Sequence, residues 1–168
     1  MLKICVHSHV QIELGAVLEI TKDVEWIDAE VSNYNESSIS NEIKHNLRNA
    51  SSRRIKKFQE QIFPQLQTYV EDYTSEPLQM ESFTLVRYTE GQFFGEHSDE
   101  VEGLNRKLSI VIYLNDDYEG GEIYFRNLNL TIKPRANSLV MFPSTEEFVH
   151  EAKPVLSGTK YAITSFWR

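Results

Sequence analysis

The sequence is short of cysteine, of cationic residues and of long apolar runs, and each shortage argues against a class of protein. Cys5 is the one cysteine, so no disulfide can form within the chain. No apolar run approaches the length of a membrane-spanning helix, and the opening segment MLKICVHSHV lacks the basic and apolar regions of a secretion signal. From these absences we expect a cytoplasmic protein with no membrane partner.

Positive charge is scarce as well. The chain has 17 Lys and Arg against 25 Asp and Glu, a formal net charge of −8. Because nucleic-acid binding needs clustered cationic side chains, we expect no nucleic-acid partner. The local exception is a basic group at the start of a helical pattern, formed by Arg53, Arg54, Lys56 and Lys57. Such a group is typical of a solvated helix face, and a contact with an acidic partner is the alternative.

Internal repeats, low-complexity tracts and linkers rich in Pro or Gly are also missing, so we expect a single domain over residues 1–168. Its hydrophobic content of 40% is enough for a buried core at this length. In the second half, β-branched and aromatic runs between turn residues predict short strands at 83–88, 108–114, 122–125, 128–132, 138–142 and 161–167. A front half that carries a helix, followed by closely spaced strands, favours an α+β fold with a β-sandwich or jelly-roll barrel.

The first half is less regular. Apolar residues at roughly helical spacing predict a helix over residues 55–73, which contains Pro64 and for which Ser51 and Ser52 are candidate N-caps. The segment 33–52 is rich in Asn and Ser, which favours a loop with a short helix. The remaining expected elements are edge strands within 2–6 and 10–20.

The triplet HSD at 97–99 is the first group that indicates chemistry. In an extended segment, residues two apart point to the same side, so the His97 imidazole and the Asp99 carboxylate can converge on one point. A third ligand has to come from the other histidines, and His150 lies between two late strands, unlike His7, His9 and His45. Two neutral imidazoles and one carboxylate are the ligand set of non-haem Fe(II) oxygenases, which leaves positions open for a co-substrate and O2.

Lys160 stands ten residues after His150, at the start of the strand pattern YAITSFW. A lysine inside a barrel is costly unless an anion pairs with it, and a dicarboxylic co-substrate would supply that anion. An exposed lysine at the end of a strand is the alternative for this residue taken alone. Beside His97, Asp99 and His150, we favour the anion-binding role.

These motifs occur in a recognisable order. Arg87-Tyr88-x-x-Gly91 precedes His97-x-Asp99, and the segments LSIVIYLND, YEGGEIYF and IKPRANSLVMFP follow before His150 and Lys160. In this order and spacing the chain resembles the prolyl 4-hydroxylase branch of the Fe(II)/2-oxoglutarate-dependent dioxygenases. The resemblance covers about residues 83–168 well and 1–80 loosely, and implies a double-stranded β-helix (jelly-roll) core over about 83–168 with supporting N-terminal helices.

The resemblance also implies roles for single residues. His97, Asp99 and His150 would bind Fe(II), and Lys160 would bind the distal carboxylate of 2-oxoglutarate. Tyr88, nine residues before His97, would help to hold that co-substrate. Tyr113, on the strand after the triplet, is expected to line the same pocket, with core packing as the alternative for both tyrosines. O2 would be the second co-substrate, and ascorbate is expected as a reductant.

The substrate that the resemblance implies is proline within a peptide, oxidised with release of succinate and CO2. Two positions depart from the pattern of the family. Phe94 stands where many prolyl hydroxylases carry a tyrosine, and Phe166 where a tryptophan is common, with Trp167 displaced by one. We expect Phe94, Tyr118, Phe166 and Trp167 to be available to the peptide, and the segment 32–52 is a candidate lid.

Three alternatives stay open at this point. Hydroxylation of a free amino acid or other small molecule would use the same chemistry, as would oxidative repair of nucleic acids. The acidic balance and the lack of paired C-terminal arginines argue against the repair activity. A cupin-like binding protein without catalysis is the third, and Lys160 argues against it, because a binding protein has no need of a dicarboxylate anchor. Neither the exact substrate nor the oligomeric state follows from the sequence.

Overall fold

The computed structural model describes residues 3–10, 19, 21–35 and 38–168, and these residues are mainly strands. In the first half lie β1 (Cys5–His7), β2 (Ile27–Asp28), β3 (Val31–Asn35), β4 (Ser38–Glu42), β5 (Arg48–Asn49), β6 (Ser51–Arg53) and the helix α2 (Lys56–Tyr73). In the second half lie β7 (Met80–Thr89), β8 (Phe93–His97), β9 (Leu108–Tyr113), β10 (Glu119–Gly120), β11 (Ile123–Phe125), β12 (Leu130–Ile132), β13 (Ser138–Pro143), β14 (His150–Ala152), β15 (Val155–Ser157) and β16 (Thr159–Trp167). Two short 3-10 helices, Arg126–Leu128 and Glu146–Phe148, lie in the connections.

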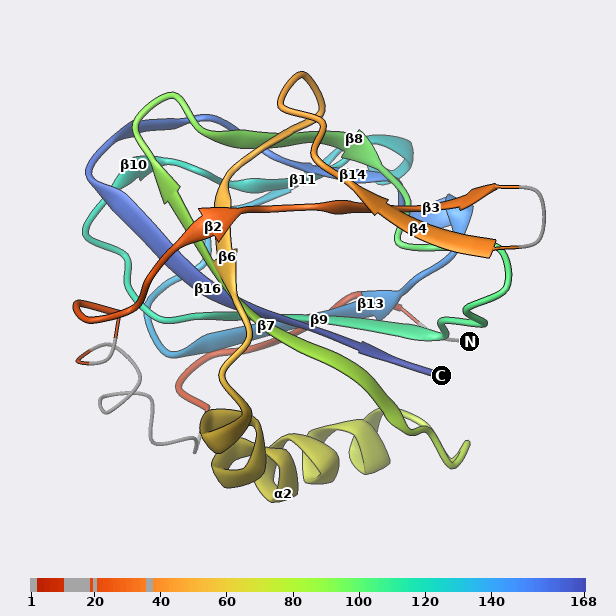
Figure 1. Cartoon of the computed structure of the whole chain (residues 1–168). Coiled ribbons are helices and arrows are strands. Elements are labelled where there is room, and N and C mark those ends of the chain that lie inside the picture. Colours follow the sequence, from red (N-terminus) through yellow and green to blue (C-terminus); the bar gives the residue numbers. More distant parts are fainter. Residues whose placement is uncertain (1–2, 11–18, 20, 36–37) are drawn as a thin grey trace.

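Two antiparallel sheets form the body of the fold. The larger has seven strands in the order β1-β13-β9-β16-β7-β6-β2, and the smaller has five in the order β12-β11-β14-β8-β5. Short pairs, β10 with β15 and β3 with β4, complete the described strands. In Figure 1 the two sheets lie one above the other, with α2 below the larger sheet. The neighbours in each sheet are often far apart in sequence, as in a jelly roll.

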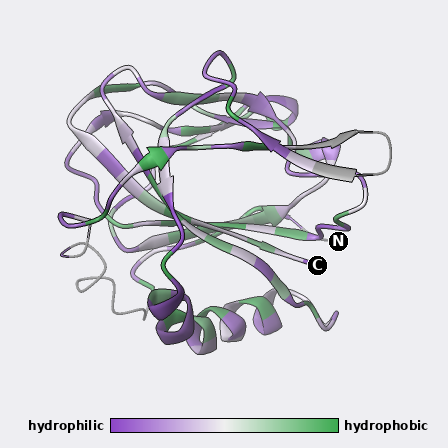
Figure 2. Cartoon of the chain, viewed as in Figure 1, coloured by the Kyte–Doolittle hydropathy of each residue, from purple (hydrophilic) through white to green (hydrophobic). Residues whose placement is uncertain are grey.

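One apolar core lies between α2 and the larger sheet. The helix buries Phe58, Ile62, Leu66 and Val70, which recur every four residues and so share one face. They pack against apolar residues of β7, β9, β13 and β16, Trp167 among them. The mixture of hydrophobic and hydrophilic residues along α2 is visible in Figure 2.

A second core lies between the two sheets. It contains buried residues from the opposite faces of the same strands, such as Val86, Val140 and Ala162, together with Ile123 and Phe125 of the smaller sheet. Successive side chains of a strand point to opposite faces of the sheet, so neighbouring residues of one strand belong to different cores. The candidate site belongs to this second region.

The structure corrects several expectations for the first half. Segment 33–52 is not a loop with a short helix, because it contains β4, β5 and β6 and the end of β3. The proposed N-caps Ser51 and Ser52 are wrong, since both lie in β6, and Ile55 precedes the helix without a side-chain cap. An edge strand is present at β1, whereas most of the strand expected over 10–20 lies outside the described residues.

The strands expected in the second half are confirmed as β7, β9, β11, β12, β13 and β16, with small shifts of their ends. The pattern missed β8 and the two-residue β10, and it also missed β14 and β15, which are three residues each and separated by Lys153 and Pro154. No helix in the described part of the chain is both long and apolar enough to cross a membrane.

Candidate metal centre

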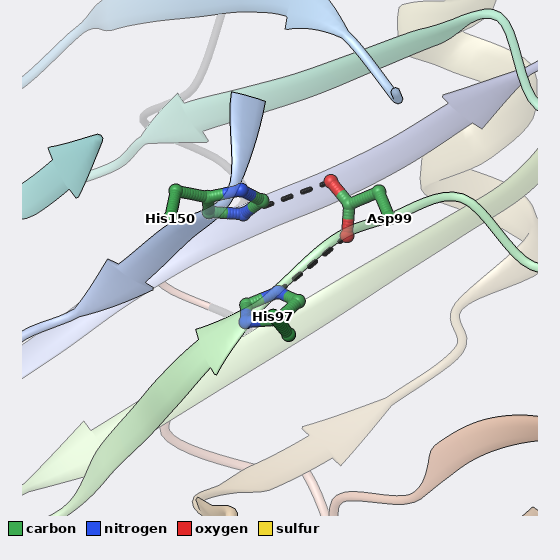
Figure 3. Close-up of side chains that lie close together, drawn as sticks. All are labelled: His97, Asp99 and His150. Carbon is green, nitrogen blue, oxygen red and sulfur yellow. Dashed lines mark ion pairs between the residues drawn. The ribbon is translucent and has the colours of Figure 1, made fainter. Parts of the chain in front are cut away.

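His97, Asp99 and His150 meet between the two sheets. His97 ends β8, and His150 begins β14, the strand paired with β8, so that the two histidines are cross-strand partners. Asp99 follows two residues after His97 and points back between them, as Figure 3 shows. Its carboxylate oxygens lie 3.5 Å from His97 Nε2 and 3.7 Å from His150 Nε2.

Both imidazoles are held in the same way. Nδ1 of His97 lies 2.7 Å from the carbonyl oxygen of Gly95, and Nδ1 of His150 lies 2.9 Å from that of Phe148. A carbonyl oxygen only accepts hydrogen bonds, so Nδ1 carries the proton in each ring. In the neutral imidazole this leaves the lone pair on Nε2, the atom that faces Asp99.

The charge state of the group suits metal binding. Burial lowers the pKa of His150 to about 4, against the opposing effect of Asp99, so that this imidazole is neutral at neutral pH. Burial raises the pKa of Asp99, but His150 becomes charged as the pH falls through about 4 and, with His97 beside it, then holds the pKa of the Asp99 carboxyl well below its usual range. The site therefore combines lone pairs on nitrogen with one full negative charge.

This donor set fits a divalent transition-metal ion. One potential ligand atom from each of the three side chains lies within 4.8 Å of the other two. Among the described residues, no other three His, Cys, Asp or Glu side chains come together in this way. Two imidazoles and one carboxylate on one side of an ion leave its other side open, the arrangement of non-haem Fe(II) oxygenases. The other histidines lie elsewhere: His45 is 3.5 Å from Asp28, and His7 stacks edge-on against Tyr69.

A small cavity of about 60 Å³ extends from the three residues to Lys160. Lys160 is buried and donates a hydrogen bond of 2.6 Å to the carbonyl oxygen of Gly121. An ammonium group has three donors, and among the described residues no carboxylate lies within ion-pair distance of this one. Burial lowers the pKa of Lys160 to about 7, with Glu122 opposing the effect. The cavity thus ends in a cationic group that lacks an anion.

The backbone at Gly121 is adapted to this lysine. Gly121 has a φ of 65°, and a Cβ on it would lie 3.1 Å from Lys160 Cδ and 3.0 Å from the Tyr118 ring. A side chain there would displace the lysine, so the glycine permits both the turn and the close contact.

Tyr88 and Tyr113 stand on either side of Lys160. Each ring centroid lies 5.2 Å from Lys160 Nζ, and both tyrosines line the cavity. Burial raises the pKa of both hydroxyls, so that they stay neutral and can donate hydrogen bonds. The two residues that the sequence associated with the co-substrate are thus brought together with the lysine.

The structure adds a residue that the sequence did not indicate. Arg48, from β5, lines the cavity beside Tyr88, and its charge partly opposes the effect of burial on the pKa of that hydroxyl. Its guanidinium also lies 4.7 Å from the centroid of the Phe94 ring and donates to the carbonyl oxygen of Glu30 at 2.6 Å. Its position in an Asn- and Ser-rich segment gave no signal, because only the pairing of β5 with β8 places it here.

Of the four aromatic residues expected near the substrate, two line the cavity. Phe94 stacks on the His97 ring with 3.5 Å between centroids, and Phe166 lies on the same side of β16 as Lys160. The expectation is wrong for Trp167, which is fully buried on the helix side and stacks on Phe63. It is also wrong for Tyr118, which is buried and does not line this cavity.

Comparison with known proteins agrees with this geometry. The family described as the 2OG-Fe(II) oxygenase superfamily matches residues 83–168. A protein of Acanthamoeba polyphaga mimivirus named "Putative prolyl 4-hydroxylase" is 28% identical over 142 residues, which are 73% of this chain and 58% of the viral protein. The mouse 2-oxoglutarate and iron-dependent oxygenase domain-containing protein 3 is 34% identical over 86 residues, 48% of this chain and 27% of that protein. The chain thus spans less than two thirds of the length of these relatives.

Solved structures establish the fold. A prolyl hydroxylase from Trichoplax adhaerens, in complex with a peptide fragment of the hypoxia inducible factor oxygen degradation domain, has a TM-score of 0.74 at 18% identity and covers 98% of this chain and 82% of its own. A Pseudomonas putida prolyl-4-hydroxylase has a TM-score of 0.72 at 19% identity, with 98% and 92% covered. The described fold is therefore the α+β double-stranded β-helix of this group.

Proposed function

This chain belongs to the 2OG-Fe(II) oxygenase superfamily, and from that premise we propose that it hydroxylates proline within a peptide, as a prolyl 4-hydroxylase-like enzyme. The family makes it a 2-oxoglutarate-dependent dioxygenase that uses Fe(II), 2-oxoglutarate and O2. In the proposal the 168 residues form one dioxygenase domain, with the jelly-roll core over about 83–168.

The proposal assigns the iron to His97, Asp99 and His150. Support comes from the two Nε2 lone pairs and the buried carboxylate, which face one another at 3.5 and 3.7 Å. When bound there, iron supplies the oxidation that puts one oxygen atom into a C–H bond while 2-oxoglutarate is converted to succinate and CO2. The chain contributes a fixed ligand geometry and a site largely shielded from water.

Lys160 is assigned to the distal carboxylate of 2-oxoglutarate. Support comes from its burial at the end of the cavity and from the ammonium protons that have no carboxylate partner among the described residues. Tyr88 and Tyr113 would donate hydrogen bonds to the same co-substrate and orient its chain between their rings. A charge-assisted pair in a site of low polarity is strong and directional, so the keto acid end is aimed at the three metal ligands.

The observation that carries a peptide substrate is a polar groove that lies next to this cavity. It encloses about 370 Å³ and shares three lining residues with the cavity, Arg48, Thr164 and Phe166. An extended proline-containing chain suits such a groove, because it is pre-ordered and has no internal hydrogen bonds. Ser32 and Asn41, from the β3–β4 hairpin, also line the groove, and in the proposal this hairpin is the part of segment 32–52 that covers the bound chain.

The test is incubation of the protein with Fe(II), ascorbate, 2-oxoglutarate and a panel of proline-containing peptides under air. The expected result is a peptide heavier by one oxygen atom, hydroxyproline on hydrolysis, and an equal amount of succinate, with ascorbate sustaining turnover. The His150→Ala variant is the control for chemistry outside the site. Succinate that stays at background with every peptide, but rises with a free amino acid, would contradict the peptide substrate and leave the cofactor assignment standing.

A further inference from the structure

The groove is lined by a group of arginines. Its lining residues are Ile27, Asp28, Glu30, Ser32, Asn41, Arg48, Ser52, Arg53, Arg54, Ser82, Thr84, Arg106, Thr164 and Phe166. Four of these are arginines, on a chain whose formal net charge is −8. The groove is therefore locally rich in positive charge on a protein whose net charge is negative.

These arginines differ in whether they already have an anionic partner. Arg106 forms an ion pair of 2.7 Å with Glu81 and lies over the Phe166 ring. By contrast, no carboxylate in the described part of the chain lies within 4 Å of the guanidinium groups of Arg48, Arg53 or Arg54. Three guanidinium groups of the groove thus have no carboxylate partner among the described residues.

The four residues of the basic group seen in the sequence lie in two different places. Arg53, in β6, and Arg54 line the groove, whereas Lys56 and Lys57 lie in the first turn of α2, are exposed and do not line it. Lys56 is 3.8 Å from Glu60, a solvent-exposed pair on the helix. The solvated helix face is therefore formed by Lys56 and Lys57, whereas the two arginines line the groove.

Two carboxylates also line the groove, and the four arginines outnumber them. Asp28 has His45 beside it at 3.5 Å. Glu30 is exposed, and its backbone carbonyl accepts the hydrogen bond from Arg48. Serine and threonine hydroxyls fill much of the remaining wall, and they accept or donate hydrogen bonds to a carboxylate or a peptide backbone.

We propose that this groove selects peptide substrates that carry acidic residues close to the target proline, with Arg53 and Arg54 binding the carboxylate side chains. The inference rests on the proposed function, because it places the acidic residues in the chain that delivers the proline to the cavity. Arg48 marks the end of the groove where that chain enters the cavity, since it lines both. Guanidinium groups suit this role because their planar donors match a carboxylate in two hydrogen bonds.

Two labelled peptides test the proposal. Each has a central proline flanked by alanines, and beyond them stand pairs of glutamates in one peptide and pairs of glutamines in the other. Binding is measured by fluorescence anisotropy on the Fe(II)- and 2-oxoglutarate-loaded protein without O2, and hydroxylation is measured by mass after O2 is admitted. We expect the glutamate peptide to bind about tenfold more tightly, with the difference shrinking as salt is added.

Variants of the protein test whether the preference depends on the arginines of the groove or only on the overall charge of the protein. Arg53→Gln/Arg54→Gln should remove most of the preference, while Lys56→Gln/Lys57→Gln, which removes the same charge three residues along the chain, should keep it. Arg53→Glu/Arg54→Glu should reverse it toward a peptide with lysines at the same positions. Thermal unfolding of each variant checks that the fold is retained.

The outcomes distinguish this inference from the function on which it rests. Equal affinity and equal hydroxylation for the glutamate and glutamine peptides would overturn the inference and leave proline hydroxylation intact. Tight binding of the glutamate peptide without hydroxylation of either would support the acidic groove and contradict the proposed function. A single-stranded oligonucleotide that binds more tightly than the glutamate peptide, and loses affinity in Arg53→Gln/Arg54→Gln, would assign the groove to nucleic acid and overturn the inference.

Discussion

The two faces of the larger sheet are built from the same strands and have opposite tasks. On β16, Tyr161, Ile163 and Trp167 pack toward α2, whereas Lys160 and Thr164 line the cavity on the other side. The helix side is apolar and closed, so its residues contribute mainly to stability. The cavity side contains a buried lysine, an aspartate and two histidines, which are costly to bury and are retained for chemistry. Stability and function should therefore respond to substitution separately.

The largest expected effect is on the cavity side. His150→Ala removes one of three ligands, so Fe(II) binding and oxidation of any substrate should be lost, while the fold is retained. The Fe(II) content after anaerobic loading measures metal binding, and circular dichroism checks that the fold is retained. His45→Ala, a histidine outside the site, is the matched control and should bind iron normally. Retention of iron by His150→Ala would contradict the ligand assignment.

The opposite response is expected on the helix side. Leu66 is fully buried between α2 and the sheet, so Leu66→Ala should lower the free energy of unfolding by about 2–5 kcal/mol, through lost burial and the cavity left behind. Denaturant unfolding measures the loss. The affinity for Fe(II) of the folded protein should stay as it is, and a change as large as that in His150→Ala would show that the two faces are not separable.

A smaller and more selective effect is expected at Lys160. Lys160→Ala removes a charge-assisted contact of about 1.5–3 kcal/mol, so the Kd for 2-oxoglutarate should rise about ten- to hundredfold, with little change in Fe(II) affinity. Lys153→Ala, at a half-buried lysine outside the cavity that pairs with Glu151, is the control. An unchanged Kd for 2-oxoglutarate in Lys160→Ala would remove the lysine from the site.

The same lysine predicts a pH dependence. Its pKa is about 7 before the co-substrate binds, and a bound carboxylate should raise it, so binding above pH 7 requires uptake of a proton. The Kd for 2-oxoglutarate should therefore be flat below pH 7 and rise up to about tenfold per pH unit above it. Lys160→Arg stays charged throughout this range and should flatten the profile. Isothermal titration at several pH values measures it, and a flat wild-type profile would contradict the prediction.

The smallest expected effect concerns the support of Asp99. Ser109 lines the cavity with Asp99 and helps to lower the pKa of its carboxyl, and the Ser109 hydroxyl lies 2.8 Å from the Ser144 hydroxyl. Ser109→Ala should weaken Fe(II) binding about tenfold, at the lower end of effects for groups that orient metal ligands. Ser165→Ala, a buried serine on the neighbouring strand, should leave Fe(II) affinity unchanged, and equal effects of both would indicate general destabilisation.

Many of the strands and site residues on the two faces could be predicted from the sequence. The predictions that failed did so for physical reasons. Strands β9 and β13 were evident because they are buried on both faces and mostly apolar, and β16 was evident from its aromatic and β-branched residues. The strands of segment 33–52 were missed because the segment is rich in Asn and Ser, and because β5 and β6 pair with β8 and β7, which lie far along the chain.

The residues of the candidate site also fall into those that the sequence indicated and those that it missed. The site residues of the second half were indicated by their spacing, and Arg53 and Arg54 by the basic group they belong to. Arg48, and the position of these three arginines along one groove, depend on tertiary pairing. The error at Trp167 was avoidable, since alternate residues of a strand face opposite sides and Phe166 already faces the cavity.

The central claim is that one cavity holds both iron and 2-oxoglutarate, the iron on His97, Asp99 and His150 and the co-substrate on Lys160. Anaerobic titration of the protein with Fe(II) and 2-oxoglutarate, followed by visible absorption, tests it most directly. The wild type should develop the weak charge-transfer band of the iron–keto acid chelate with one iron per chain. Lys160→Ala should develop the same band only at about ten- to hundredfold higher 2-oxoglutarate, and His150→Ala should not develop it. A band that survives in His150→Ala, or that has the same 2-oxoglutarate dependence in Lys160→Ala as in the wild type, would contradict the account.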